Sequence, residues 1–356
     1  MNRKGVIYDV GSVTGLNWRP VFDPPIVHRE LEIIKNDLHC NAVRIRGQDL
    51  HRLMVAAQDA LEQGLEVWFS PELWNKTPEQ TLRYIGKAAL AAEPLRKRWP
   101  DQLVFSVSSE ATLFMQGIVE GRTIHKRMSR PSFRATIQAG KQNGPLQQYL
   151  QRATERVRQV FHGQVTYASL IWEQVDWKLF DIVGVDHYWH ERIQDRYLAL
   201  LQPLFACGKP VVITEFGFPS SQGAGQADGL MSLGGNADLT TLILHQLPGI
   251  GRWIKPRVKR LVERDETLQA TRLVTQLKLL ESAGVDGAFV FTFSFPLSPY
   301  DDNPYYDLDR ASASLVKSYV GGKHGTTYPE MMWEPKESFR AVADYYASPE
   351  ANLRQV

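Results

Sequence analysis

The sequence has few cysteines, little net charge and no long apolar run, and each of these shortages excludes a class of protein. Its 356 residues include only Cys40 and Cys207, too few for a disulfide framework or a cysteine-based metal cluster. Lys and Arg number 41 against 39 Asp and Glu, so the net charge of +2 gives no support for binding nucleic acid or a membrane surface. No apolar stretch approaches the roughly 20 residues of a membrane span, and no signal region follows the basic start. We therefore expect a soluble, cytoplasmic protein.

Sequence motifs for cofactors and metals are missing as well. No glycine-rich dinucleotide turn follows the first strand-like run, and the Gly-rich stretch 220–235 lacks the spacing and the Lys-Ser/Thr ending of a P-loop. His187 and His190 give only a weak zinc signal. We expect neither a cofactor nor a metal.

The strongest feature that is present is an alternation of short β-rich runs with helical periodicity. The strand-like runs cover residues 5–11, 41–47, 65–71, 103–110, 164–170, 182–189, 210–217 and 287–294. Helical periodicity covers 29–38, 49–63, 77–98, 148–161, 192–207 and 267–283, is poor after the fifth run, and returns at 335–347. This order predicts one (β/α)₈ barrel, a TIM barrel, that spans residues 1–356 as a single domain. The alternative is a doubly wound open sheet.

Three connections are longer than simple loops: 111–145, 218–265 and 295–334. Each follows a strand, so in a barrel all three emerge at the C-terminal face, where barrel enzymes keep their active sites. We interpret them as walls of one pocket rather than as further domains. Basic pieces at 125–134 and 252–264 either steer an anionic substrate or form solvated helix faces.

Two glutamates occupy matching positions at strand ends. Glu110 ends the fourth run in Val107-Ser108-Ser109-Glu110, and Glu215 lies near the end of the seventh in Ile213-Thr214-Glu215-Phe216. A carboxylate at the end of a buried strand is costly unless it is paired or functional. The pair suggests acid/base work at the barrel mouth, and the alternative is that each caps a helix or pairs with an arginine.

These motifs resemble those of clan A retaining glycoside hydrolases, which carry an acid/base glutamate after strand four and a nucleophile glutamate after strand seven. The run 213–217 (ITEFG) is similar to the nucleophile strand of family five cellulases and mannanases. The run 41–45 (NAVRI) is similar to their second strand, and His187-Tyr188 resembles their active-site residues on strand six. The whole sequence is also similar to uncharacterised bacterial proteins labelled abortive infection proteins.

The resemblance implies double displacement, with Glu215 as the nucleophile and Glu110 as the acid/base. Arg44, with Arg46 on the same strand face, is expected to hold Glu215 ionised or to belong to an internal salt-bridge lattice. Tyr188 is expected to hydrogen-bond Glu215.

Further residues are expected to bind the sugar. His187, Asp9 and Glu72 are candidates for hydroxyl contacts, whereas strand alternation is expected to point Asp186 away from His187. The aromatic side chains of Trp74, Trp172 and Phe295 suit stacking on sugar rings, or else pack the loops.

Two departures from the family are visible. Ser109 stands where family members have an asparagine that contacts the sugar 2-hydroxyl, and phenylalanines replace the tryptophan platform of strand eight. The sequence therefore predicts a retaining glycosidase or transglycosylase that acts on a small or oligomeric, β-linked sugar. The alternatives are a barrel enzyme of different chemistry on an anionic or non-sugar substrate, and a non-catalytic carbohydrate-binding or defence-related barrel.

Overall fold

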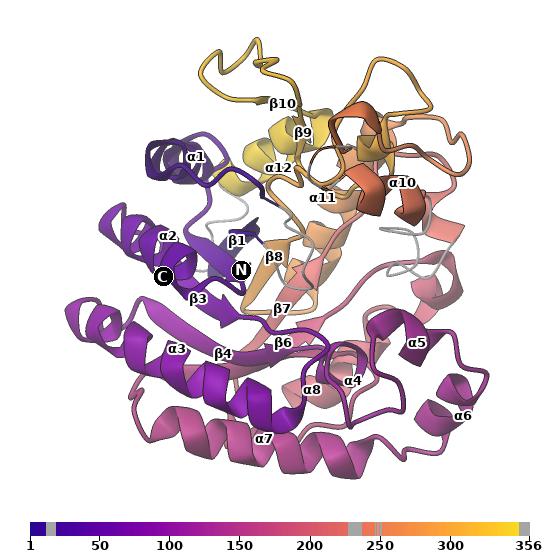
Figure 1. Cartoon of the computed structure of the whole chain (residues 1–356). Coiled ribbons are helices and arrows are strands. Elements are labelled where there is room, and N and C mark those ends of the chain that lie inside the picture. The colour runs from indigo at the N-terminus through magenta and orange to yellow at the C-terminus, as the bar shows by residue number, and fades with distance from the viewer. Residues whose placement is uncertain (12–18, 227–236, 246, 248, 250, 349–356) are drawn as a thin grey trace.

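Eight parallel strands close into a barrel, as predicted (Figure 1). A computed structural model describes residues 1–11, 19–226, 237–245, 247, 249 and 251–348. The strands are β1 Arg3–Asp9, β2 Ala42–Gly47, β3 Glu66–Pro71, β4 Leu103–Ser109, β5 Gln164–Leu170, β6 Val183–Asp186, β7 Val211–Phe216 and β8 Gly287–Val290. The strands pair in chain order, and β1 pairs with β8, so the open-sheet alternative is wrong.

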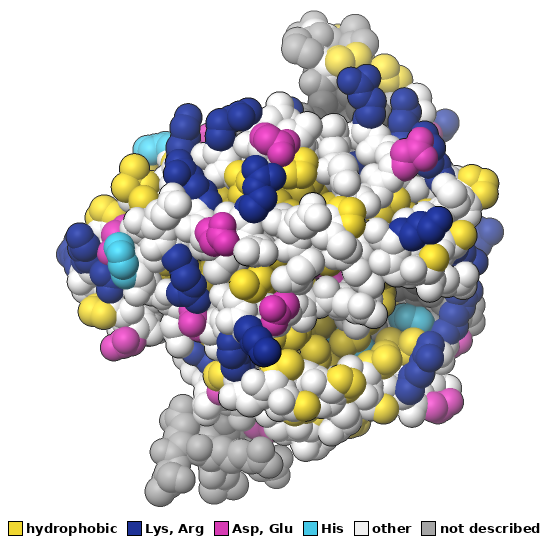
Figure 2. All heavy atoms as spheres, turned by 90° about the horizontal axis from the view of Figure 1, so that it is seen from below, with side chains coloured by type: hydrophobic (Ala, Val, Ile, Leu, Met, Phe, Trp, Pro, Cys, Tyr) yellow, Lys and Arg dark blue, Asp and Glu magenta, His cyan; other side chains and the backbone are white. Residues whose placement is uncertain are grey.

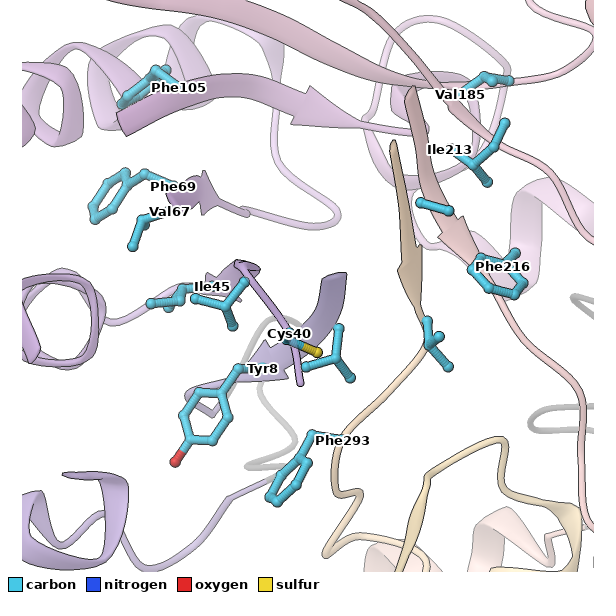
Figure 3. Packing of buried hydrophobic residues seen from close by; sticks show 14 of the residues in the cluster. Tyr8, Cys40, Ile45, Val67, Phe69, Phe105, Val185, Ile213, Phe216 and Phe293 are labelled. Atoms are coloured by element: carbon cyan, nitrogen blue, oxygen red, sulfur yellow. The ribbon is translucent and has the colours of Figure 1, made fainter. Parts of the chain in front are cut away.

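Alternate residues of each strand point to opposite sides of the barrel wall. Outward side chains such as Tyr8, Ile45 and Phe69 join the main core between the sheet and the helices (Figure 3). Inward side chains such as Trp68 and Phe289, whose ring centroids lie 5.0 Å apart, fill the interior. The period of two therefore decides which side chains reach the mouth of the barrel.

Long helices cover the barrel wall (Figure 1). They are α1 Pro24–Asn36, α2 Leu50–Glu62, α3 Pro78–Arg98, α7 Asn143–Arg158, α11 Glu266–Ser282 and α12 Glu337–Ala347. Local signals explain their starts: the Thr77 side chain accepts from the Gln80 N–H, and the Gln80 side chain accepts from the Thr77 N–H in return. The first helix begins five residues before the predicted start because proline is tolerated in a first turn.

The segment between β6 and β7 departs from the prediction of one helix over 192–207. It forms the 3₁₀ turns η2 Glu191–Arg196 and η3 Ala199–Leu201, then the short α8 Gln202–Phe205. Pro203 lies in the first turn of α8 and has no N–H to donate to an earlier turn, which favours the start of a new helix at this point. After β5 only the 3₁₀ turn η1 Trp177–Leu179 follows, where the periodicity was poor.

The three long connections carry small elements of their own. The first holds α4 Ala111–Phe114, α5 Ile124–Met128 and α6 Ser132–Gln138; the second holds η4 Ala224–Gln226, α10 Leu239–His245 and η5 Gly251–Trp253; the third holds η6 Leu308–Ala311, β9 Val316–Ser318 and β10 Trp333–Pro335. Residues 227–236 of the second connection lie outside the described residues.

A buried ion network joins the second and third connections. Arg264 lies 2.8 Å from Asp307 and 3.0 Å from Asp309, and Asp309 also accepts from the buried Lys336 ammonium at 2.9 Å. The loops are thereby tied to each other and to the start of α12. Among the described helices, none combines the length and the apolar character that a membrane crossing needs.

Candidate active site

Charged side chains gather where the inward faces of the strands end. Asp9 of β1, Arg44 and Arg46 of β2, and Glu72 just after β3 are all buried, and all are linked by ion pairs within 3.6 Å to one another or to Glu215. This is the C-terminal face, as the barrel topology requires.

Glu215 is held by three donors, two from β2 and one from the segment directly after β6. Arg46 Nη1 lies 3.2 Å and Arg44 Nη1 3.5 Å from Glu215 Oε2, and the Tyr188 hydroxyl donates to Oε1 at 2.6 Å. An ionised carboxylate can only accept hydrogen bonds, and these donors match that form. The side chain keeps 10% exposure, so one edge remains accessible from the mouth.

An irregularity in β7 aims Glu215. The pairing of β7 with β6 shifts register between Val185 and Asp186 of β6. The pairing of β7 with β8 shifts register between Ile213 and Phe216 of β7. Bulges of this kind are common at barrel rims, where they redirect a side chain. The same register shift occurs in β4 between Ser106 and Ser109, directly before Glu110.

Glu110 lies in a left-handed backbone conformation, with φ 44° and ψ 49°. Its own N–H donates to the Ala168 carbonyl at 2.8 Å. The Tyr167 hydroxyl accepts from the Ala111 N–H at 2.8 Å, and Glu173 accepts from the Thr112 N–H at 3.1 Å and from Tyr167 at 2.7 Å. A buried tyrosine and carboxylate therefore hold the turn that carries Glu110.

The environment of Glu110 differs from that of Glu215. Glu110 is 2% exposed, and its buried Oε1 has no hydrogen-bond partner. Burial raises the pKa of Glu110 well above its ordinary value, and the carboxylates of Asp186 and Glu215 add to this increase. Such a group retains its proton at pH values at which an ordinary glutamate is ionised. The two glutamates thus occupy the environments that a proton donor and an anion require.

Arg44 and Arg46 contact Glu215 and also belong to an internal salt-bridge lattice. In this lattice Arg44 lies 3.4 Å and Arg46 3.3 Å from Glu72, while Arg46 lies 3.4 Å from Asp9. Burial raises the pKa of Asp9 to about 7, although Arg46 opposes the shift. Asp9 and Glu72 are therefore beside the glutamates but are already bound to arginine.

Aromatic side chains flank one side of this cluster. The Trp74 ring stacks on Phe114 at 3.7 Å, and its Nε1–H donates to Glu72 at 3.1 Å. Trp74, Phe114, Glu72 and Ser109 belong to one pocket, together with Leu73, Ser108 and Met115. The predicted residues Trp74, Glu72 and Ser109 are thus neighbours.

Strand eight contributes a residue that the sequence did not single out. The Phe291 ring lies 5.5 Å from the Arg46 guanidinium, and the predicted Phe295 lies 6.4 Å from Phe291. Trp172 follows β5 and is 37% exposed. It directly precedes Glu173, the carboxylate that accepts from the Thr112 N–H in the turn that carries Glu110.

The expected orientations of Asp186 and His187 are reversed in the structure. Asp186 points into the barrel, where it lies 3.6 Å from Arg44 and accepts from the Thr214 hydroxyl at 2.5 Å. His187 points outward: its ring stacks on Tyr197 at 4.1 Å, and its Nε2 lies 2.9 Å from the Tyr197 carbonyl oxygen. Tyr188 contacts Glu215, so the residues before and after His187 share the inward face and His187 cannot. The prediction that His187 binds a hydroxyl finds no support in this geometry.

Replacing His187 with glutamine is expected to flatten the pH dependence of stability between pH 6.5 and 4. Burial lowers the pKa of His187 from 6.5 to about 4, so between these values the unfolded chain binds a proton that the folded chain does not. This contribution to stability is complete above pH 6.5 and is lost as the pH falls through 4, at up to about 1.4 kcal/mol per pH unit. Thermal unfolding of both proteins at steps of pH measures the difference in slope. Parallel curves would contradict the buried, neutral histidine.

Within the described residues, no group of three or more His, Cys, Asp or Glu side chains is arranged to hold a metal ion. The cluster at the mouth consists of carboxylates bound to arginines.

Solved structures of sugar-cleaving enzymes share this fold. No protein-family model and no curated protein sequence matches the chain. A GH113 β-1,4-mannanase superimposes with a TM-score of 0.59 at 15% identity, over 97% of this chain and 99% of the other. A β-glucuronidase from Ruminococcus gnavus gives 0.54 at 15% identity, over 97% of this chain and 50% of the other. A fungal β-1,4-galactanase gives a TM-score of 0.52 at 12% identity, over 97% of this chain and 99% of the other. At these identities the likeness concerns the fold.

Proposed function

We propose that the protein is a retaining glycoside hydrolase in which Glu215 is the nucleophile and Glu110 the general acid/base. The observation that carries the proposal is the contrast between the two glutamates. Glu215 accepts from Arg44, Arg46 and Tyr188, whereas Glu110 is buried with a raised pKa. Paired carboxyl groups with opposed environments divide acid and nucleophile roles in this way.

In the first step, a Glu215 oxygen attacks the anomeric carbon as the bond from that carbon to the glycosidic oxygen breaks. Glu110 gives its proton to the departing oxygen, and a covalent glycosyl-enzyme forms. In the second step, the ionised Glu110 takes a proton from water, whose oxygen attacks the same carbon and releases Glu215. The Glu215 carboxylate is thereby regenerated and again accepts hydrogen bonds from Arg46 and Tyr188.

Five cations of the two basic pieces at 125–134 and 252–264 already have partners. The buried Arg127 donates to two backbone carbonyls and to Asn75, and Arg264 lies in the ion network with Asp307 and Asp309. Exposed pairs join Arg130 to Glu120, Arg257 to Asp238, and Lys255 to Asp301. On the face seen in Figure 2, Lys and Arg side chains are spread out with Asp and Glu between them.

The mouth itself is rich in carboxyl groups. Arg44 and Arg46 stand among five of them: Asp9, Glu72, Glu110, Asp186 and Glu215. Both arginines already have carboxyl partners here, so a uronic-acid carboxylate brought to this site would have to displace one of those partners, which costs binding energy. We therefore propose a neutral, β-linked sugar as the substrate.

The purified protein is expected to hydrolyse a neutral nitrophenyl β-glycoside and to reject the matching β-uronide. Proton NMR of the first product formed, before mutarotation, should show the β-anomer, as double displacement requires. A panel of gluco-, manno- and galactosides, each paired with its uronide where one exists, supplies matched substrates. Release of the α-anomer would contradict retention. A sugar that raises the melting temperature without being consumed would favour the binding-protein alternative.

A further inference from the structure

The carboxylate of Asp186 is hydrogen-bonded to the residues that precede Glu110 and Glu215. It ends β6, is 3% exposed, and faces the barrel interior on the same side as Tyr188. Strand β6 pairs with β5 on one side and with β7 on the other. The side chain is therefore placed between the strand that carries Glu215 and the region that carries Glu110.

Each oxygen of Asp186 binds the residue directly before one of the glutamates. The Thr214 hydroxyl donates to Oδ1 at 2.5 Å, and Thr214 precedes Glu215. The Ser109 hydroxyl donates to Oδ2 at 3.3 Å, and Ser109 precedes Glu110. One carboxylate thus spans the two segments on which the reacting side chains stand.

Arg44 extends this connection to the nucleophile itself. Its Nη1 lies 3.6 Å from Asp186 Oδ1, donates to the Thr214 carbonyl at 2.9 Å and lies 3.5 Å from Glu215. The regular strand pairing is interrupted beside both glutamates, at the register shifts of β4 and β7. Side-chain bonds supply the restraint at the points where regular backbone pairing does not.

We propose that Asp186 is a positioning residue that sets the relative placement of Glu110 and Glu215 through Ser109, Thr214 and Arg44. This inference rests on the proposed function for its kinetic consequences. Its geometric content, the restraint of two carboxyl groups, does not depend on that function.

Asp186 also belongs to the charges that surround Glu110. The other groups that act on Glu110 are Glu215, Glu173 and Arg46. Burial and the charge of Glu215 raise the pKa of Asp186 to about 8, and the same two causes also raise the pKa of Glu110. Removal of this carboxylate leaves the other three groups in place and lowers the pKa of Glu110.

Kinetics of Asp186→Asn and Asp186→Ala on a hydrolysed aryl glycoside test the proposal. Alanine removes both hydrogen bonds, and kcat is expected to fall about 100-fold with KM little changed, as for a small misplacement of reacting groups. Asparagine is the same size and keeps an acceptor for Thr214, so it should restore most of kcat. It should also move the alkaline limb of the kcat/KM profile to lower pH, because it carries no charge.

Asp309→Asn is the matched control. Asp309 is a buried carboxylate with cationic and hydroxyl partners, in the loop network rather than beside the glutamates. The Asp309→Asn substitution is expected to lower the melting temperature without changing the pH profile of kcat/KM.

The losses in kcat from Thr214→Val and Asp186→Ala should combine to less than their product in the double variant, because both substitutions remove the same hydrogen bond.

Two results would overturn the inference. One is an Asp186→Ala enzyme that loses only thermal stability, as the Asp309 control does. The other is a crystal structure of Asp186→Ala in which the separation of the Glu110 and Glu215 carboxyl groups equals that of the wild type. Because that structure needs no substrate, it judges the positioning claim even if the wild type hydrolyses no glycoside and the proposed function fails.

Discussion

Replacing Glu215 with alanine is expected to abolish measurable hydrolysis of aryl glycosides, with a loss in kcat on the order of 10⁶-fold. The variant lacks the oxygen that forms the glycosyl-enzyme, and Arg44, Arg46 and Tyr188 lose the carboxylate that they bind. Initial rates with a dinitrophenyl glycoside, whose departure needs no acid, measure the loss. Because chemistry rather than binding is removed, KM should change far less than kcat.

Added azide distinguishes a nucleophile from a merely structural carboxylate. Azide fits the space left by the side chain and should attack the opposite face of the sugar, so that Glu215→Ala forms the α-glycosyl azide. Glu72→Gln is the matched control, because Glu72 is buried in the same lattice and binds the same two arginines. It should show a smaller loss and no azide product. An α-azide formed by the Glu72 variant, or none formed by the Glu215 variant, would contradict the assignment.

Replacing Glu110 with alanine is expected to give a loss that depends on the leaving group. General acid catalysis contributes roughly 10²–10⁴-fold, so cleavage of an alkyl or sugar leaving group should slow by that factor. A dinitrophenolate leaves without a proton, so its first step should be nearly unchanged and the glycosyl-enzyme should accumulate. Burst kinetics separate the two steps.

The pH profile gives an independent check on Glu110. In the wild type, Glu110 must be protonated to act as the acid, so kcat/KM falls as the pH rises through its raised pKa. Glu110→Ala should lose this alkaline limb, and azide should restore the second step with formation of the β-glycosyl azide. Equal losses for good and poor leaving groups would contradict a role as acid.

The barrel could be predicted because its signal is local. Each buried parallel strand is an apolar run, each long helix carries its own period and end signals, and the order of eight such pairs leaves few topologies. The positions of Glu110 and Glu215 follow from that order alone, because strands of a barrel all end at one face. The contacts of Glu215 with Arg44, Arg46 and Tyr188 are expected from the family resemblance and are present.

The sequence does not predict side-chain directions where the strand pattern is irregular. It also does not predict contacts with residues from distant parts of the chain. His187 and Tyr188 were both placed in the site, although adjacent strand residues cannot share a face. Asp186 is the inward residue, and its partners Thr214 and Ser109 come from other strands. Glu173 and Tyr167 hold the Glu110 turn by contacts that no sequence pattern marks. The prediction of one helix over 192–207 is wrong, because 3₁₀ turns precede the short α8 and Pro203 lies in its first turn.

The most direct test of the account is the site of covalent labelling by a 2-deoxy-2-fluoro-β-glycoside with a dinitrophenyl leaving group. Fluorine slows both the formation and the hydrolysis of the glycosyl-enzyme. The dinitrophenyl leaving group speeds the formation again, so the glycosyl-enzyme accumulates. We predict a mass increase of one fluoroglycosyl group, located by peptide sequencing on Glu215 and absent from Glu215→Ala. A label on Glu110, or no label on an enzyme that hydrolyses the parent glycoside, would contradict double displacement at Glu215.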